Sequence, residues 1–125
     1  MWFDSTESPK YNIINKNMER KKIYIAGKIT GLSIAECYEN FHTARVMLDF
    51  YCYEIVSPIH HCKIGMAYEE CMEICLQLLE ECDGIYMMIN WEDSNGAKRE
   101  LSRAKELQEK NPDFIIIYEN ICSYK

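Results

Sequence analysis

What this sequence lacks narrows its possible functions. It has no apolar run approaching the ~20 residues that a membrane-spanning helix needs, and its N-terminus lacks the apolar core of a signal peptide. It has no basic excess either: 14 Lys and Arg against 20 Asp and Glu give a formal net charge of −6. General nucleic-acid binding requires a basic surface that replaces counterions, so nucleic acid is not an expected partner. Because no membrane-spanning run is present, a membrane is not an expected partner either. A small anion is compatible with this charge, because backbone N–H groups at a helix N-terminus can hold one phosphate.

Common metal-binding spacings are also missing. His60, His61 and Cys62 are adjacent, and Cys71 and Cys75 lie one helical turn apart, but no paired CxxC or HxxxH motif occurs. We therefore expect neither a metal site nor a cofactor. The cysteines are odd in number, and most lie in helical or strand-like patterns. Without an export signal they are predicted to be reduced thiols of a cytoplasmic protein. The seven are Cys37, Cys52, Cys62, Cys71, Cys75, Cys82 and Cys122.

The length and the apolar content fit one globular domain. The chain has 125 residues, of which 48% are apolar and 27% are charged. A chain of this length buries roughly two-thirds of its unfolded surface and needs no disulfide bonds or metal ions to fold. Residues 1–21 are polar and show no periodicity, so they are expected to form a flexible N-terminal extension. The domain is predicted to span residues 22–118, with a tail at 119–125.

Strand-like and helix-like patterns alternate along this domain. Alternation of this kind indicates a parallel sheet with helices on both faces. For so short a chain we predict a single flavodoxin-like three-layer α/β domain, whose four or five strands follow the order 2-1-3-4. The expected strands are residues 22–26, 53–56, 85–89 and 114–118, and the expected helices are residues 34–50, 68–82 and 96–110.

Two unusual loops follow the first and third predicted strands. In an open parallel sheet, ligands bind beyond the carboxyl ends of the strands, where the strand order switches direction. For the order 2-1-3-4, that point lies between strands 1 and 3. The loops GKITGL (27–32) and WEDSNG (91–96) meet there. A polar, glycine-containing turn directly after the apolar run GIYMMIN is therefore expected to leave the core at a ligand crevice.

The first loop offers the elements of a phosphate or sugar cradle. Gly27 and Gly31 permit close approach of the backbone, and Lys28 and Thr30 add polar side chains before a helix begins. Its glycine spacing is not that of a Walker A loop or of a dinucleotide-binding fingerprint. A plain strand-to-helix turn is an equally good interpretation of this loop taken alone.

The second loop leads into a helix whose first turns are polar. Ser94 is suited to be the N-cap of this helix, and its hydroxyl, close to Gly96, could also contact an anion. The ring of Trp91 is expected either to stack on a base at the rim of the crevice or to form a hydrophobic lid. Asp93 is a further candidate contact. Glu100, one turn into the helix, fits either a solvated glutamate that complements the helix dipole or a site residue.

Three segments resemble one known superfamily. They are KIYIAGKITG, SPIHH and CDGIYMMINWEDSNGAKRELSRAKEL, and together they are similar to the nucleoside 2-deoxyribosyltransferase-like superfamily over roughly residues 22–118. The resemblance is strongest to a small group, found in phages and gut bacteria, with a YIAGPMTG-like first strand and a GWExSxGAxxE-type turn. The second motif is fairly specific, and the first is less so.

The resemblance implies roles for individual residues. Glu100 matches the nucleophile that attacks C1′ of the sugar and forms a glycosyl-enzyme ester, and Tyr24 matches the tyrosine that orients it. In the branch that hydrolyses nucleotides, a strand-1 glycine loop and a serine bind the 5′-phosphate, and these match Gly27–Gly31 and Ser94, with Gly96 beyond it. The family also implies a homodimer or larger homo-oligomer.

The sequence departs from the family pattern at two positions. Cys75 stands where the characterised enzymes carry an aspartate, and Lys28 stands where a proline is usual. Glu92 and Asp93 are carboxyls near the site, but neither is at the matching position. Two functions are therefore expected. One is an N-glycosidase or (deoxy)ribosyltransferase acting on a nucleoside or nucleotide. The alternative is a non-catalytic protein that sequesters a nucleotide or an ADP-ribose-type signal in phage–host conflict.

Overall fold

The computed structural model describes residues 20–62 and 65–119. The strands are β1 (Lys22–Ala26), β2 (Glu54–Val56), β3 (Gly84–Met87) and β4 (Ile115–Tyr118), and the helices are α2 (Ile34–Phe50), α3 (Tyr68–Glu80) and α4 (Asn95–Lys110). All strand pairs are parallel, in the order β2-β1-β3-β4. The predicted flavodoxin-like fold is therefore confirmed with four strands. Most of the predicted N-terminal extension and C-terminal tail lies outside the described residues.

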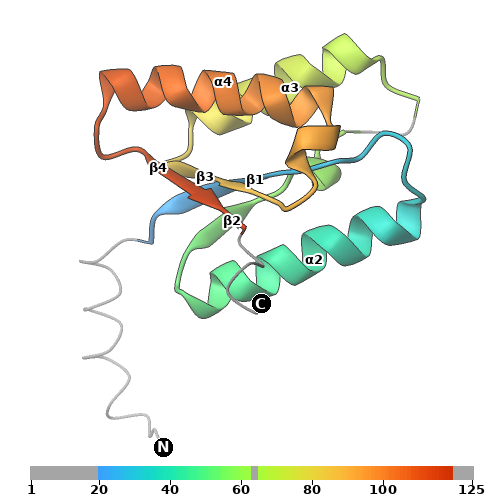
Figure 1. Ribbon diagram of the computed structural model, residues 1–125, viewed down its shortest axis with the longest axis horizontal. Helices are drawn as coiled ribbons and strands as arrows, with labels where there is room; N and C mark the ends of the chain where they lie inside the picture. The colour runs from blue at the N-terminus through green and yellow to red at the C-terminus, as the bar shows by residue number, and fades with distance from the viewer. Residues whose placement is uncertain (1–19, 63–64, 120–125) are drawn as a thin grey trace, which may run out of the picture.

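The sheet is the middle of three layers. Helix α2 covers one face, and α3 and α4 lie side by side on the other (Figure 1). Alternate residues of β1 serve the two layers: Ile23 and Ile25 pack with the buried residues of α2, whereas Tyr24 and Ala26 pack beneath α3 and α4. Because both faces are covered, the central strands β1 and β3 are almost wholly buried, as their apolar sequences predict.

Helix α2 begins as the sequence predicts. Ser33 caps it, and the reciprocal hydrogen bonds between Ser33 and Glu36 form a capping box. The buried face of α2 is narrow, because α2 lies against the sheet along a single stripe of side chains. Its buried side chains are Cys37, Phe41, Ala44 and Leu48, whereas Ile34, Tyr38 and Met47 are exposed.

Two elements end earlier than the sequence predicts. Helix α3 stops at Glu80, because the N–H of Asp83 already donates to Lys22 as the chain enters the sheet. Strand β3 stops at Met87, and Ile89 beyond it is half exposed. Two short 3₁₀ turns, η1 (Pro58–His60) and η2 (Trp91–Asp93), interrupt the predicted loops. No helix in the described part of the chain is long and apolar enough to cross a membrane.

Candidate functional site

A cavity of about 800 Å³ opens beyond the carboxyl ends of β1 and β3. The loop after β1, the first turns of α3 and the N-terminus of α4 form its walls, so it occupies the switch point that the strand order predicts. Of the predicted site residues, those that line it are Gly27, Lys28, Thr30, Cys75, Asp93, Ser94, Gly96 and Glu100.

At one wall of this cavity, a phenol and a carboxyl form a buried pair. The hydroxyl of Tyr24 donates to Oε2 of Glu100 over 2.5 Å. Tyr24 projects from the middle of β1 and is fully buried, and Glu100 projects from the second turn of α4 and is only 5% exposed. The family resemblance predicts that these two side chains meet, and the hydrogen bond confirms this contact. Hydrogen bonding to the phenol holds the carboxyl in one orientation.

Burial governs the protonation of this pair. Loss of water raises the pKa of Glu100 to about 7, although the hydrogen bonds from Tyr24 and Cys75 and the charge of Arg99 act in the opposite direction. Burial, followed by the negative charge of Glu100, raises the pKa of Tyr24 well above its ordinary value. At neutral pH the phenol therefore keeps its proton, while Glu100 is divided between its neutral and ionised forms.

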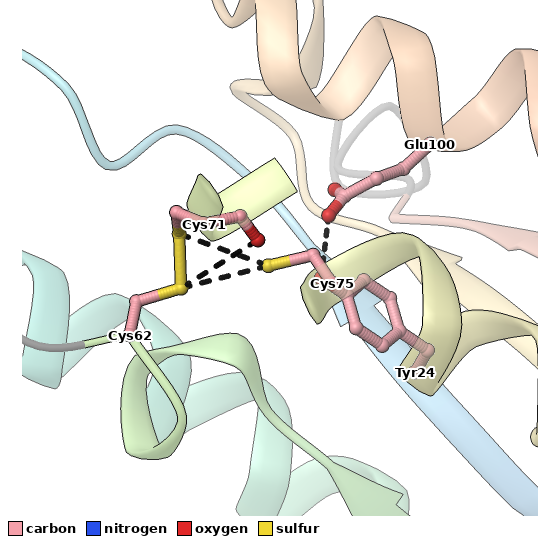
Figure 2. The surroundings of a disulfide bond; sticks show 5 residues. All are labelled: Tyr24, Cys62, Cys71, Cys75 and Glu100. Atoms are coloured by element: carbon pink, nitrogen blue, oxygen red, sulfur yellow. Dashed lines mark hydrogen bonds between the residues drawn. A yellow bond between two sulfur atoms is a disulfide. The ribbon is translucent and has the colours of Figure 1, made fainter. Parts of the chain in front are cut away.

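The thiol of Cys75 lies next to this pair. Cys75 projects from α3 into the same buried cluster as Tyr24, and it lines the cavity together with Glu100 (Figure 2). Burial raises the pKa of the Cys75 thiol to about 11, despite its hydrogen bond with Tyr24. Cys75 thus faces the tyrosine and the glutamate with a neutral thiol.

The loop after β1 forms less of a cradle than its sequence predicts. The N–H of Lys28 donates to Oδ1 of Asn90 over 3.0 Å, so this donor is already used. A Cβ on Gly27 would lie 1.9 Å from Cε of Met88, so a larger residue there would have to displace the Met88 side chain just beyond β3. Gly31 adopts a φ of +89° in the turn before α2 and does not line the cavity.

The N-terminus of α4 is the more open anion-binding element. Oγ of Ser94 accepts from the N–H of Ala97 over 3.0 Å, so Ser94 is the predicted N-cap. Its own O–H remains able to donate, and the first N–H groups of a helix have no partner within the helix. A Cβ on Gly96 would lie 3.2 Å from Sδ of Met72, so this glycine allows α3 and α4 to approach closely at the cavity.

Trp91 does not line the cavity, contrary to the rim position that the sequence suggested. Its ring lies 6.1 Å from that of Tyr118 on β4, measured between centroids, and it packs against the buried cluster beneath α3 and α4. The reason is local: η2 begins at Trp91 and carries the following residues, Asp93 and Ser94, toward the cavity.

Two cavity residues escaped the sequence analysis. Tyr68 is 46% exposed and lines the cavity. Arg99 stacks on it, with its guanidinium carbon 5.7 Å from the ring centroid, and also pairs with Glu69. The available signal was the position of Arg99 one turn after Ser94, since side chains on a helix lean toward its N-terminus.

The prediction that all cysteines are reduced is wrong for two of them. Cys62 and Cys71 form a disulfide bond, whereas Cys37, Cys52, Cys75 and Cys82 are free; Cys122 lies outside the described residues. The chain after η1 returns to the start of α3, and this brings the two Cα atoms to 5.6 Å. Nothing in the local pattern around either cysteine signals this closure.

The fold and the cavity together define a class: a three-layer α/β domain with a candidate small-molecule site at the switch point of its parallel sheet. Within that class, residues 21–111 match the model of the family described as Domain of unknown function (DUF4406), and the chain belongs to this family. No curated protein matches the chain.

Proposed function

We propose that this protein is an N-glycosidase or (deoxy)ribosyltransferase that acts on a nucleoside or nucleotide through Glu100. The observation that carries the proposal is the buried hydrogen bond between Tyr24 and Glu100 at a cavity of about 800 Å³. An oriented carboxylate suits attack on an anomeric carbon, because the transition state resembles an oxocarbenium ion and the ester that forms can later be hydrolysed.

The proposed reaction has two steps. The carboxylate of Glu100 forms a bond to C1′ while the C1′–N bond breaks, and the leaving base takes a proton from an acid. Water, or a second base, then attacks C1′ and gives up a proton to the ionised acid, while the ester bond to C1′ breaks and releases the carboxylate. Asp93 is our candidate for the acid, since Asp93 and Glu100 are the only carboxyl residues among the described residues that line the cavity. Glu92, the other candidate in the sequence, is exposed on η2 away from this lining.

The polar end of the cavity supports a phosphate-bearing substrate. Ser94 and the first turn of α4 offer donors for an anion, and Lys28 and Arg99 line the same space. Arg99 is held by Glu69 and Tyr68, so its charge has a defined place. A 5′-monophosphate bound there would be neutralised even though the whole chain is acidic.

The test is to follow free base and ligand binding together, at pH 8, with a panel of nucleosides, 5′-nucleotides and cyclic ADP-ribose-type molecules. At this pH most Glu100 is ionised, because its pKa is about 7. Wild type should release base from at least one class of substrate. Glu100→Ala should abolish release yet bind within about tenfold of wild type, since the carboxylate acts mainly in the transition state.

A second function, binding without turnover, is favoured by one observation: a neutral thiol at Cys75 stands beside Glu100 where the resembled enzymes have a carboxylate. A sequestering protein would bind a nucleotide or ADP-ribose-type molecule tightly and release no base from any panel member over hours. Cys75→Asp separates the two functions. In an enzyme it should preserve or raise base release, and in a binder it should create at most a trace. Tight binding without any release by wild type would end the proposal of catalysis.

A further inference from the structure

Three sulfur atoms converge beside the cavity. Cys62 follows η1, and Cys71 and Cys75 lie one turn apart on α3. All three Sγ atoms lie within 4.8 Å of one another, and Figure 2 shows them facing a common point. Cys71 and Cys75 also line the cavity. This is the one such group of potential metal donors in residues 20–62 and 65–119.

The spacing around Cys75 suits a thiolate metal site. Zn²⁺ binds sulfur at about 2.3 Å in tetrahedral geometry, which places neighbouring sulfurs about 3.8 Å apart. Sγ of Cys75 lies 3.7 Å from Sγ of Cys62 and 4.0 Å from Sγ of Cys71. Both sulfur–sulfur distances that involve Cys75 are thus already close to the value of about 3.8 Å expected for two ligands of one tetrahedral ion. The disulfide bond joins the third pair, Cys62 and Cys71.

We propose that, when the Cys62–Cys71 disulfide is reduced, Cys62, Cys71 and Cys75 bind one thiophilic d¹⁰ cation such as Zn²⁺. A dithiol or phosphine reductant supplies two electrons, and two protons complete the two thiols. The cation then replaces the protons of all three thiols, so three protons are released for each ion bound. Three protein ligands leave a fourth coordination position for water or for a molecule in the cavity.

The oxidised and metal-bound states exclude each other, because the disulfide uses two of the three ligand sulfurs. Cys75 belongs to both this site and the cavity of the proposed glycosidase, but the test of metal binding requires no turnover. The full chain is reduced with a phosphine, freed of reductant without oxygen, and titrated with Cd²⁺ while the ultraviolet cadmium–thiolate band is recorded. Zn²⁺ stoichiometry is measured in parallel by native mass spectrometry.

The reduced wild type should bind one ion per chain with the band of three thiolates, and the oxidised chain should bind none. Cys75→Ser and Cys62→Ser should each remove about one third of the band and weaken binding at least tenfold. Cys52→Ser is the matched control, because this exposed free cysteine lies outside the cluster, and it should bind like wild type. Circular dichroism before titration shows that each variant is folded. Failure of the reduced wild type to bind, or binding that both cluster variants retain, would overturn the proposal.

Discussion

At the scale of single residues, burial makes the ionised form of Glu100 costly to the folded chain, and the proposed reaction uses that same ionised form. Burial raises its pKa from 4.5 to about 7, so the folded chain holds a proton that the unfolded chain releases between these values. Stability from this group is therefore fully present below pH 4.5 and is lost as the pH rises through 7. Glu100→Gln keeps an acceptor for Tyr24 and cannot ionise, so at pH 8 it should be more stable than wild type by about 3 kcal/mol.

The measurement is the free energy of unfolding by urea, from pH 4 to pH 8, with the disulfide intact throughout. The advantage of Glu100→Gln should shrink toward zero near pH 4.5. Glu92→Gln removes an exposed carboxyl of η2 and serves as the matched control. If Glu100→Gln and wild type followed parallel curves over the whole pH range, the buried carboxyl would not control stability as described.

At the scale of elements, the N-terminus of α4 has one observed role, the helix cap, and one proposed role, the binding of an anion. Ser94 caps the helix through the N–H of Ala97, and its hydroxyl is also offered to the cavity. Ser94→Ala should cost about 1 kcal/mol of stability through the lost cap. It should also weaken a 5′-monophosphate more than its nucleoside, by about 1–3 kcal/mol, because a hydrogen bond to a charged group is lost.

Titration calorimetry with both ligands measures this difference. Ser33→Ala is the matched control, since Ser33 caps α2 in the same way but does not line the cavity. It should lower stability by a similar amount and leave both affinities unchanged. Equal weakening of the monophosphate and the nucleoside by Ser94→Ala would count against a phosphate contact there.

At the scale of the whole molecule, the homodimer that the family resemblance implies remains a prediction. The two most exposed large apolar side chains among the described residues lie at the C-terminal end of α2: Phe50 is 79% exposed and Tyr51, directly after the helix, 64%, with Val46 one turn earlier 54% exposed. Such a patch suits an interface. Phe50→Glu should convert a dimer to a monomer in light scattering, whereas His42→Glu, exposed on the same helix, should not. A wild-type monomer at high protein concentration would contradict this prediction.

Much of the fold follows from local patterns in the sequence. The apolar runs of β1 and β3, the capping box at Ser33 and the N-cap at Ser94 are each set by residues within one turn or strand, so they could be predicted. The parallel order then follows from the alternation of strands and helices. Element ends were less certain, because pairing across the sheet and burial, rather than local pattern, decide where α3 and β3 stop.

The sequence by itself determined which chemical groups are present and on which elements they lie, including Tyr24 on a central strand and Glu100 on the helix after WEDSNG. Only the tertiary structure decided which groups meet. Tyr24 and Glu100 are 76 residues apart, and stacking of α4 on β1 brings them together and removes the water that would lower the pKa of Glu100. The same packing turns Tyr68 and Arg99 toward the cavity and Trp91 away from it. It also brings Cys62 next to Cys71 on α3, where the two form a disulfide bond. Distances between side chains that are remote in sequence depend on how whole elements pack.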